Sequence, residues 1–149
     1  MGVNLALAFC YFCSLNAGRM RLITHIKASN LLSFGPDGLD LELRDLNVLI
    51  GANGSGKSNF LEIFEVLKSL PRSDEDSNNL RQIISRGGGK AEWIWKGNKE
   101  SSLFYIESVV ALLYARSFKH GIKINLSSGI EVSEEFIENM ENDGLKEPD

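Results

Sequence analysis

Hydrophobic and polar positions alternate along much of the chain, and alternation of this kind predicts β-strands. Residues 21–28 form one alternating run, and Leu39, Leu41 and Leu43 alternate with charged residues in a second run. A turn rich in glycine at residues 35–38 separates the two runs. Strands with one polar face are typical of antiparallel sheets. We therefore expect the chain to open with two antiparallel strands.

Residues 46–50 follow a different pattern, because they are apolar at nearly every position. Such a run predicts a strand that is buried on both faces. After a glycine-rich loop, Phe60, Ile63, Phe64 and Leu67 recur at helical spacing. This periodicity predicts an amphipathic helix. Strand, glycine loop and helix are thus expected in direct succession.

The second half of the chain predicts a short helix followed by a β-meander. The helical pattern covers residues 80–85, and Ala91, Trp93 and Trp95 then alternate as in a strand. Extended patterns continue from residue 103 to residue 132. Together with the first half, these patterns predict a mixed α+β protein of the α/β class, with a mixed sheet.

The glycine loop between the expected strand and helix fits the phosphate-binding pattern G-x-x-x-x-G-K-[ST], known as Walker A. Its residues are Gly51, Ala52, Asn53, Gly54, Ser55, Gly56, Lys57 and Ser58, and Asn59 follows them. The glycines permit positive φ and let main-chain N–H groups approach phosphate closely. We expect Lys57 to stabilise the β- and γ-phosphates and the Ser58 hydroxyl to bind Mg²⁺. The sequence therefore predicts a nucleoside triphosphate site, and Mg-ATP is the expected ligand.

Two other classes of nucleotide-binding protein fit the sequence poorly. A GTPase requires N-K-x-D for guanine, but residues 98–101 read Asn98-Lys99-Glu100-Ser101. A small-molecule kinase would continue with parallel strands and a basic lid, whereas this chain continues with alternating strands.

Residues 26–34, 46–50 and 51–59 together resemble the opening of AAA-type, ABC-like ATPases, the relatives of RecF, SMC and OLD proteins. The loop of these proteins commonly reads G-x-N-G-x-G-K-S-N, and Asn59 completes the match. The resemblance is specific over residues 20–70 and looser up to residue 137. It implies the amino-terminal lobe of a P-loop NTPase.

The same resemblance extends to a segment that often reads F-[RK]-S-F in the family and helps to hold the nucleotide. In this chain Leu31 and Leu32 replace the aromatic and the basic residue. Only Ser33 and Phe34 match, so the resemblance assigns the role to these two residues alone. A packed strand end is the competing interpretation.

We expect the ATPase domain to occupy residues 20–137. Its expected parts, with the flanking segments, are an apolar extension over 1–19, the Walker A unit over 20–70, a linker and short helix over 71–90, a β-rich part over 91–137 and an acidic tail over 138–149.

Hydrolysis requires groups that the loop does not supply. Mg²⁺ is usually also held by an aspartate at the end of an apolar strand, the Walker B motif, and another group must orient the attacking water. No run of four apolar residues followed by Asp-Glu occurs after the expected helix. Residues 126–129 resemble the ABC signature only faintly, and a hairpin turn explains them better.

We therefore expect ATP binding, with hydrolysis depending on a missing lobe or on a partner. The partner would be a second ATPase lobe or a second copy in a homodimer, and DNA enters only through the family resemblance. Two alternatives remain open, a non-catalytic nucleotide-binding regulatory subunit and a truncated gene fragment.

Composition excludes several other classes. The chain is 43% hydrophobic and 24% charged with a net charge of -4, which is ordinary for a globular protein. The sequence contains no basic stripe that would bind nucleic acid.

The apolar run at residues 3–13 is too short to span a bilayer, which takes about 20 residues. It also lacks the basic start of a secretory signal, so we expect a cytoplasmic protein without membrane contact. Cys10 and Cys13 lack the further ligands that a structural zinc needs.

Overall fold

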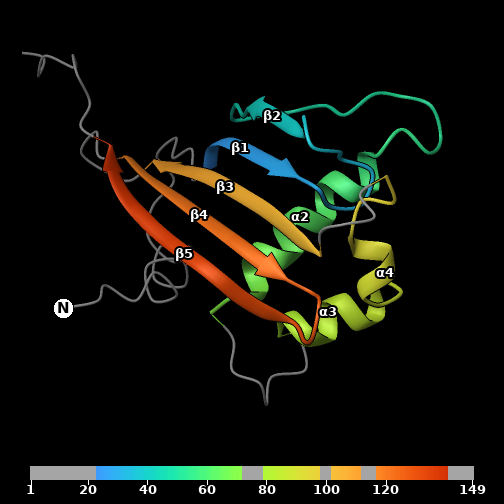
Figure 1. Ribbon diagram of the computed structural model, residues 1–149. Helices are drawn as coiled ribbons and strands as arrows, with labels where there is room; N and C mark the ends of the chain where they lie inside the picture. Colours follow the sequence, from blue (N-terminus) through green and yellow to red (C-terminus); the bar gives the residue numbers. More distant parts are fainter. Residues whose placement is uncertain (1–22, 72–78, 98–101, 112–116, 141–149) are drawn as a thin grey trace, which may run out of the picture.

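A computed structural model describes residues 23–71, 79–97, 102–111 and 117–140. Five strands and three helices make up this part of the chain (Figure 1). In chain order they are β1 (Ile23–Ser29), β2 (Leu39–Glu42), α2 (Lys57–Ser69), α3 (Leu80–Arg86), α4 (Lys90–Trp93), β3 (Leu103–Ala111), β4 (Ser117–Asn125) and β5 (Glu131–Met140).

The strands form one sheet in the order β2-β1-β3-β4-β5, and each neighbouring pair is antiparallel. The β-meander expected in the second half is confirmed, because β3, β4 and β5 are consecutive neighbours. The prediction of a mixed sheet is wrong for the described residues, in which every strand pair is antiparallel. A mixed sheet needed residues 46–50 as a parallel strand, and that segment has not joined the sheet.

Side chains alternate strictly between the two faces of β3. Phe104 and Ile106 are buried on the inner face, directly opposite Ile124 and Ile122 of β4. Opposed residues of antiparallel strands share a face, so these four side chains form one apolar layer. The opposite face of the sheet carries charged side chains that include Glu107.

Helix α2 covers the inner face of the sheet, and Figure 1 shows it running across that face. Phe60, Ile63 and Val66 point into the core, with exposed fractions of 7%, 0% and 0%. The helix predicted from the periodicity is therefore present. Helix α3 contacts α2 and adds Ile84 to the core, and α4 contacts α3.

Residues 46–50 do not form the buried strand that their apolar character predicts. Leu46, Val48 and Ile50 are 80%, 72% and 90% exposed, and the backbone is irregular. A strand buried on both faces needs neighbours on each side, and the described part of the chain provides none for this segment. The prediction was wrong because an apolar run indicates only that its side chains favour burial. It does not indicate that neighbouring strands are present to bury them.

The alternation of Ala91, Trp93 and Trp95 also does not mark a strand. Ala91 and Trp93 belong to the short helix α4. The next residue, Ile94, forms only an isolated bridge to Leu31. Three alternating positions are too few to separate a strand from a single helical turn followed by extended chain.

The acidic segment near the carboxyl end begins as a strand. β5 extends to Met140 and so includes the first residues of the expected tail. Its acids pair across the sheet with β4, since Lys123 Nζ lies 2.7 Å from Glu134 Oε2 and His120 Nε2 lies 2.8 Å from Glu135 Oε1. These cross-strand pairs explain why a charged sequence can hold an edge strand.

The expected extension over residues 1–19, with both cysteines, lies outside the described residues, as does the end of the tail beyond residue 140. None of the helices in the described ranges has the length and apolar character needed to cross a bilayer.

Two substitutions on α2 test its packing against the sheet. Ile63→Ala removes a fully buried side chain, and we expect it to lower the free energy of unfolding by about 2–5 kcal/mol. Leu61→Ala is the matched control, because Leu61 is 58% exposed, and we expect a change within about 0.5 kcal/mol. Urea denaturation measures both. Equal losses from the two variants would contradict the described orientation of the helix.

Candidate functional site

The glycine loop leads directly into the amino-terminal end of α2. Gly56 is the N-cap residue, with φ 89° and ψ 5°, and no side chain caps the helix. The first turn contains no acidic residue. The amino end of a helix carries partial positive charge and backbone N–H groups without partners in the helix. This end of α2 is therefore suited to bind an anion.

The loop backbone takes conformations that glycine alone adopts easily. Gly54 and Gly56 have φ of 81° and 89°. Ser55 N donates to Ala52 O at 3.2 Å and closes a tight turn. A Cβ atom at Gly51 would lie 2.6 Å from Ser55 Oγ, so a side chain at this position would require Ser55 to shift. The three glycines predicted to shape the loop each meet a local steric or torsional requirement.

Lys57 folds back over the loop. Its Nζ donates to Gly51 O at 2.8 Å, to Ala52 O at 2.7 Å and to Ser55 Oγ at 3.3 Å. A lysine ammonium has three hydrogens, and all three have acceptors within the loop. The positive charge predicted to meet phosphate is thus held at the same loop whose amides are expected to bind it.

Ser58 and Asn59 occupy the first turn of α2, and Ser58 is exposed. A hydroxyl at this place fits the role of a single Mg²⁺ ligand next to bound phosphate. In the ranges that the structure describes, no three His, Cys, Asp or Glu side chains are grouped to hold a metal ion. Further ligands for Mg²⁺ would have to come from the nucleotide, water or another part of the protein. Ala52 and Asn53 are exposed at the start of the loop.

Ser33 and Phe34 lie against the loop, although sequence reasoning connected them to it only through a family resemblance. A Cβ atom at Gly56 would lie 2.8 Å from Ser33 Oγ and 3.8 Å from the Phe34 ring. Ser33 Oγ therefore occupies the space that opens because position 56 has no side chain, and the Phe34 ring lies beside it.

The turn that carries Ser33 is held by contacts the sequence did not predict. Leu32 N donates to Trp93 O at 2.8 Å, and Leu31 is fully buried. Asn30 and Leu32 have positive φ angles of 60° and 53°, which residues other than glycine rarely adopt. Backbone of this kind persists where surrounding structure holds it. Backbone hydrogen bonds to Trp93 and Trp95 supply that support. No short sequence motif predicts these bonds.

A second group of charged residues lies on the outer face of the sheet, opposite α2. Asp40 Oδ2 is 3.0 Å from Lys27 Nζ, and Asp40 Oδ1 is 2.6 Å from His25 Nε2. The hydrogen bond with Asp40 raises the pKa of Lys27, and the same bond lowers the pKa of Asp40. These residues come from the neighbouring strands β1 and β2, and the side chains of Asp40 and Lys27 are exposed. We therefore interpret the group as ion pairs on the solvent-facing side of the sheet.

The outer face also contains Tyr105, whose hydroxyl donates to Glu107 Oε2 at 2.6 Å. Burial raises the pKa of Tyr105, and the neighbouring Glu107 raises it further. Tyr105 therefore stays protonated and acts as a hydrogen-bond donor to the carboxylate.

The stretch that faintly resembles an ABC signature forms the connection between β4 and β5. Residues 127–129 are bends, and Ser127 N donates to Asn125 Oδ1 at 2.8 Å. The interpretation as a hairpin turn is confirmed.

Comparison with known families adds one finding. Residues 46–111 match the family described as "AAA domain, putative AbiEii toxin, Type IV TA system". The match begins at the exposed apolar segment, includes the glycine loop and α2, and ends with β3. No curated protein matches the chain.

The contact between Ser33 and Gly56 can be tested by a double-mutant cycle. Gly54→Ala meets open space, so we expect only the cost of a left-handed backbone, about 1–2 kcal/mol. Gly56→Ala should cost more, because its new Cβ would also collide with Ser33 Oγ.

Adding Ser33→Ala to Gly56→Ala should recover the excess, whereas adding it to Gly54→Ala should not. The single variant Ser33→Ala completes both cycles, and unfolding in urea measures all five variants. Additive losses in both pairs would show that Ser33 does not contact Gly56.

Proposed function

From the match of residues 46–111 to an AAA domain of the P-loop NTPase type, we propose that this chain binds Mg-ATP through residues 51–59. The observation that carries the proposal is the loop itself. Three features lie together in it: glycines with positive φ, an uncapped helix end without acidic residues, and the Lys57 ammonium. Each of these features favours a polyphosphate.

Most residues of the loop have a defined task in this proposal. The N–H groups from Asn53 to Asn59 surround the phosphates, and Gly54 and Gly56 permit the necessary backbone turn. Lys57 leaves the carbonyls of Gly51 and Ala52 and donates to the β- and γ-phosphates. Ser58 binds Mg²⁺, and phosphate oxygens and water complete the metal's ligands.

We further propose that hydrolysis requires a second ATPase lobe from a partner. Two observations support this. The described residues contain no acidic cluster for the metal, and the apolar side chains of residues 46–50 are exposed directly before the loop. A lobe that adds a strand beside residues 46–50 would cover these side chains and bring an acid to the Mg²⁺. A second copy of this chain is the alternative occupant, and contact with DNA rests on family resemblance alone.

Removing the loop ammonium tests nucleotide binding. We expect Lys57→Ala to weaken Mg-ATP about ten- to hundredfold, since one charged hydrogen bond contributes about 1.5–3 kcal/mol. Lys68→Ala is the matched control, because Lys68 lies in the last turn of the same helix and pairs only with Glu65 among the contacts found for it. Isothermal titration calorimetry measures the affinities. Unchanged affinity in Lys57→Ala, or equal losses in the two variants, would refute the assignment.

A charge placed in the apolar segment tests whether it is free in the isolated chain. Val48 is 72% exposed, so we expect Val48→Lys to change the free energy of unfolding by no more than about 0.5 kcal/mol. The same change at the fully buried Val66 should prevent folding.

Val48→Lys should also reduce both the binding of an apolar dye and any self-association in sedimentation velocity, because both depend on exposed apolar surface. A loss of stability comparable to that of Val66→Lys would mean that residues 46–50 are already buried.

A further inference from the structure

We propose that Trp95 stacks on the base of the nucleotide whose phosphates the glycine loop binds. The inference rests on the proposed function and assigns the side of the loop on which the nucleoside lies. It depends on a continuous set of contacts from Gly56 to the Trp95 ring and on the partial exposure of Trp95.

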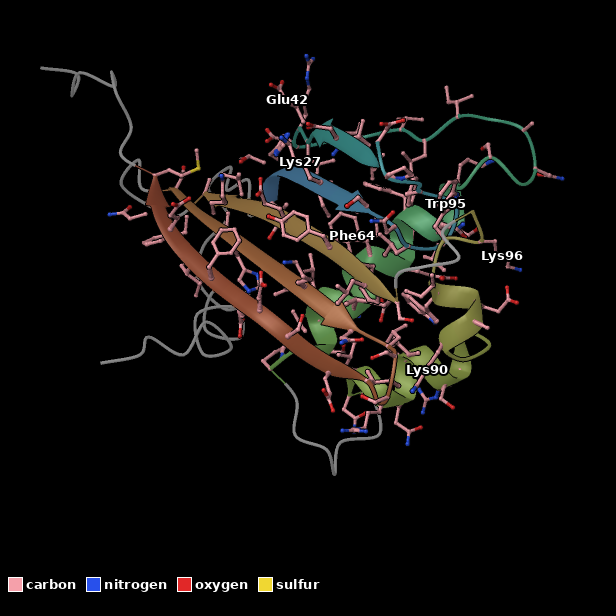
Figure 2. The ribbon with its side chains drawn as sticks, viewed as in Figure 1. Lys27, Glu42, Phe64, Lys90, Trp95 and Lys96 are labelled. Atoms are coloured by element: carbon pink, nitrogen blue, oxygen red, sulfur yellow. The ribbon has the colours of Figure 1, made fainter. Side chains whose placement is uncertain are left out.

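The contacts run through the turn at residues 33–35. Ser33 and Phe34 lie against Gly56 at the end of the loop, as described above. The next residue, Gly35, touches Trp95, since a Cβ atom at Gly35 would lie 3.2 Å from its Cε2 and Cζ2 atoms. Figure 2 shows Trp95 on the side of the molecule where α2 begins. The turn at residues 33–35 therefore contacts the end of the loop on one side and the indole on the other.

The ring of Trp95 is held in place by its surroundings. Trp95 N donates to Asn30 O at 3.1 Å, and a Cβ atom at Gly97 would lie only 2.2 Å from the ring atom Cη2. Two glycines thus leave space for the indole and pack against it. A ring that is fixed before binding loses little conformational entropy when a ligand stacks on it.

Trp95 as a whole remains partly accessible. Trp95 is half-buried and is followed by two exposed residues, Lys96 and Gly97, whereas Trp93 is 1% exposed in the core. The two tryptophans therefore have different roles, although they were predicted to share one strand face. Trp93 supports the turn, and Trp95 is the partly exposed tryptophan that touches the turn at Gly35.

The chemistry of the ligand fits this arrangement. In a nucleoside triphosphate the base is separated from the α-phosphate by one ribose, so a group near the loop but outside it is in reach of the base. Every base has a π-face, and aromatic side chains stack on bases with little sequence preference. Trp95 is thus expected to add affinity for nucleotides over bare polyphosphate, with purines favoured by their larger ring area.

The experiment compares Mg-ATP with Mg-tripolyphosphate, which has the phosphates but no base. In wild type we expect ATP to bind about tenfold more tightly than tripolyphosphate and to quench tryptophan fluorescence. Trp95→Leu should lose this preference and keep its affinity for tripolyphosphate, and Trp95→Phe should retain most of the preference. Trp93→Phe leaves Trp95 as the one tryptophan of the chain and should retain the quench.

Each result separates the two proposals. If neither ligand binds, the proposed function fails and this inference fails with it. If both ligands bind wild type equally and Trp95→Leu changes neither affinity, phosphate binding stands and base stacking is refuted. If Trp95→Leu weakens tripolyphosphate as much as ATP, Trp95 supports the loop structurally and does not contact the base. Thermal unfolding of each variant verifies that the protein is folded before titration.

Discussion

The burial of one face of α2 against the antiparallel sheet is the interaction on which the rest of the structure depends. Phe60, Ile63 and Val66 contact the apolar layer of β1, β3 and β4, and this packing fixes where the helix begins. The first turn of α2 consequently projects Lys57 and Ser58 beyond the core. A loop that is almost wholly exposed obtains a defined end because the helix behind it is anchored. Burial of apolar surface on one side of the protein thus orders the polar groups on the other.

The loop has a second support that is distant in sequence. The turn at residues 30–35 is bound to the backbone around Trp93, and it places Ser33 and Phe34 against Gly56. The segment from α4 to Trp95 is thereby connected to the loop through packed side chains and backbone hydrogen bonds. Elements that contain no part of the phosphate-binding motif therefore contribute to its geometry.

Sequence reasoning predicted the loop, α2, α3 and the β-meander, because each follows from local signals such as glycine spacing or residue periodicity. It failed where the outcome depends on neighbours. Residues 46–50 are apolar enough for a central strand but have none to join in the described part of the chain. Ala91, Trp93 and Trp95 alternate, yet Gly89 with φ 82° precedes a helical turn. The positive φ of Asn30 and Leu32 could not be predicted either, since distant backbone bonds impose it.

The hydrogen bonds of Lys57 have a consequence for ligand discrimination. An incoming anion must exchange with Gly51 O, Ala52 O and Ser55 Oγ, so the net gain is the difference between two sets of bonds. The oxygens of an orthophosphate ion all lie on one phosphorus centre, so they reach only a small part of the loop. A chain of phosphates can engage the ammonium and several amides together. The three loop oxygens therefore compete with any bound anion for the ammonium, and this competition favours a ligand that meets several loop groups at once over one that meets Lys57 alone.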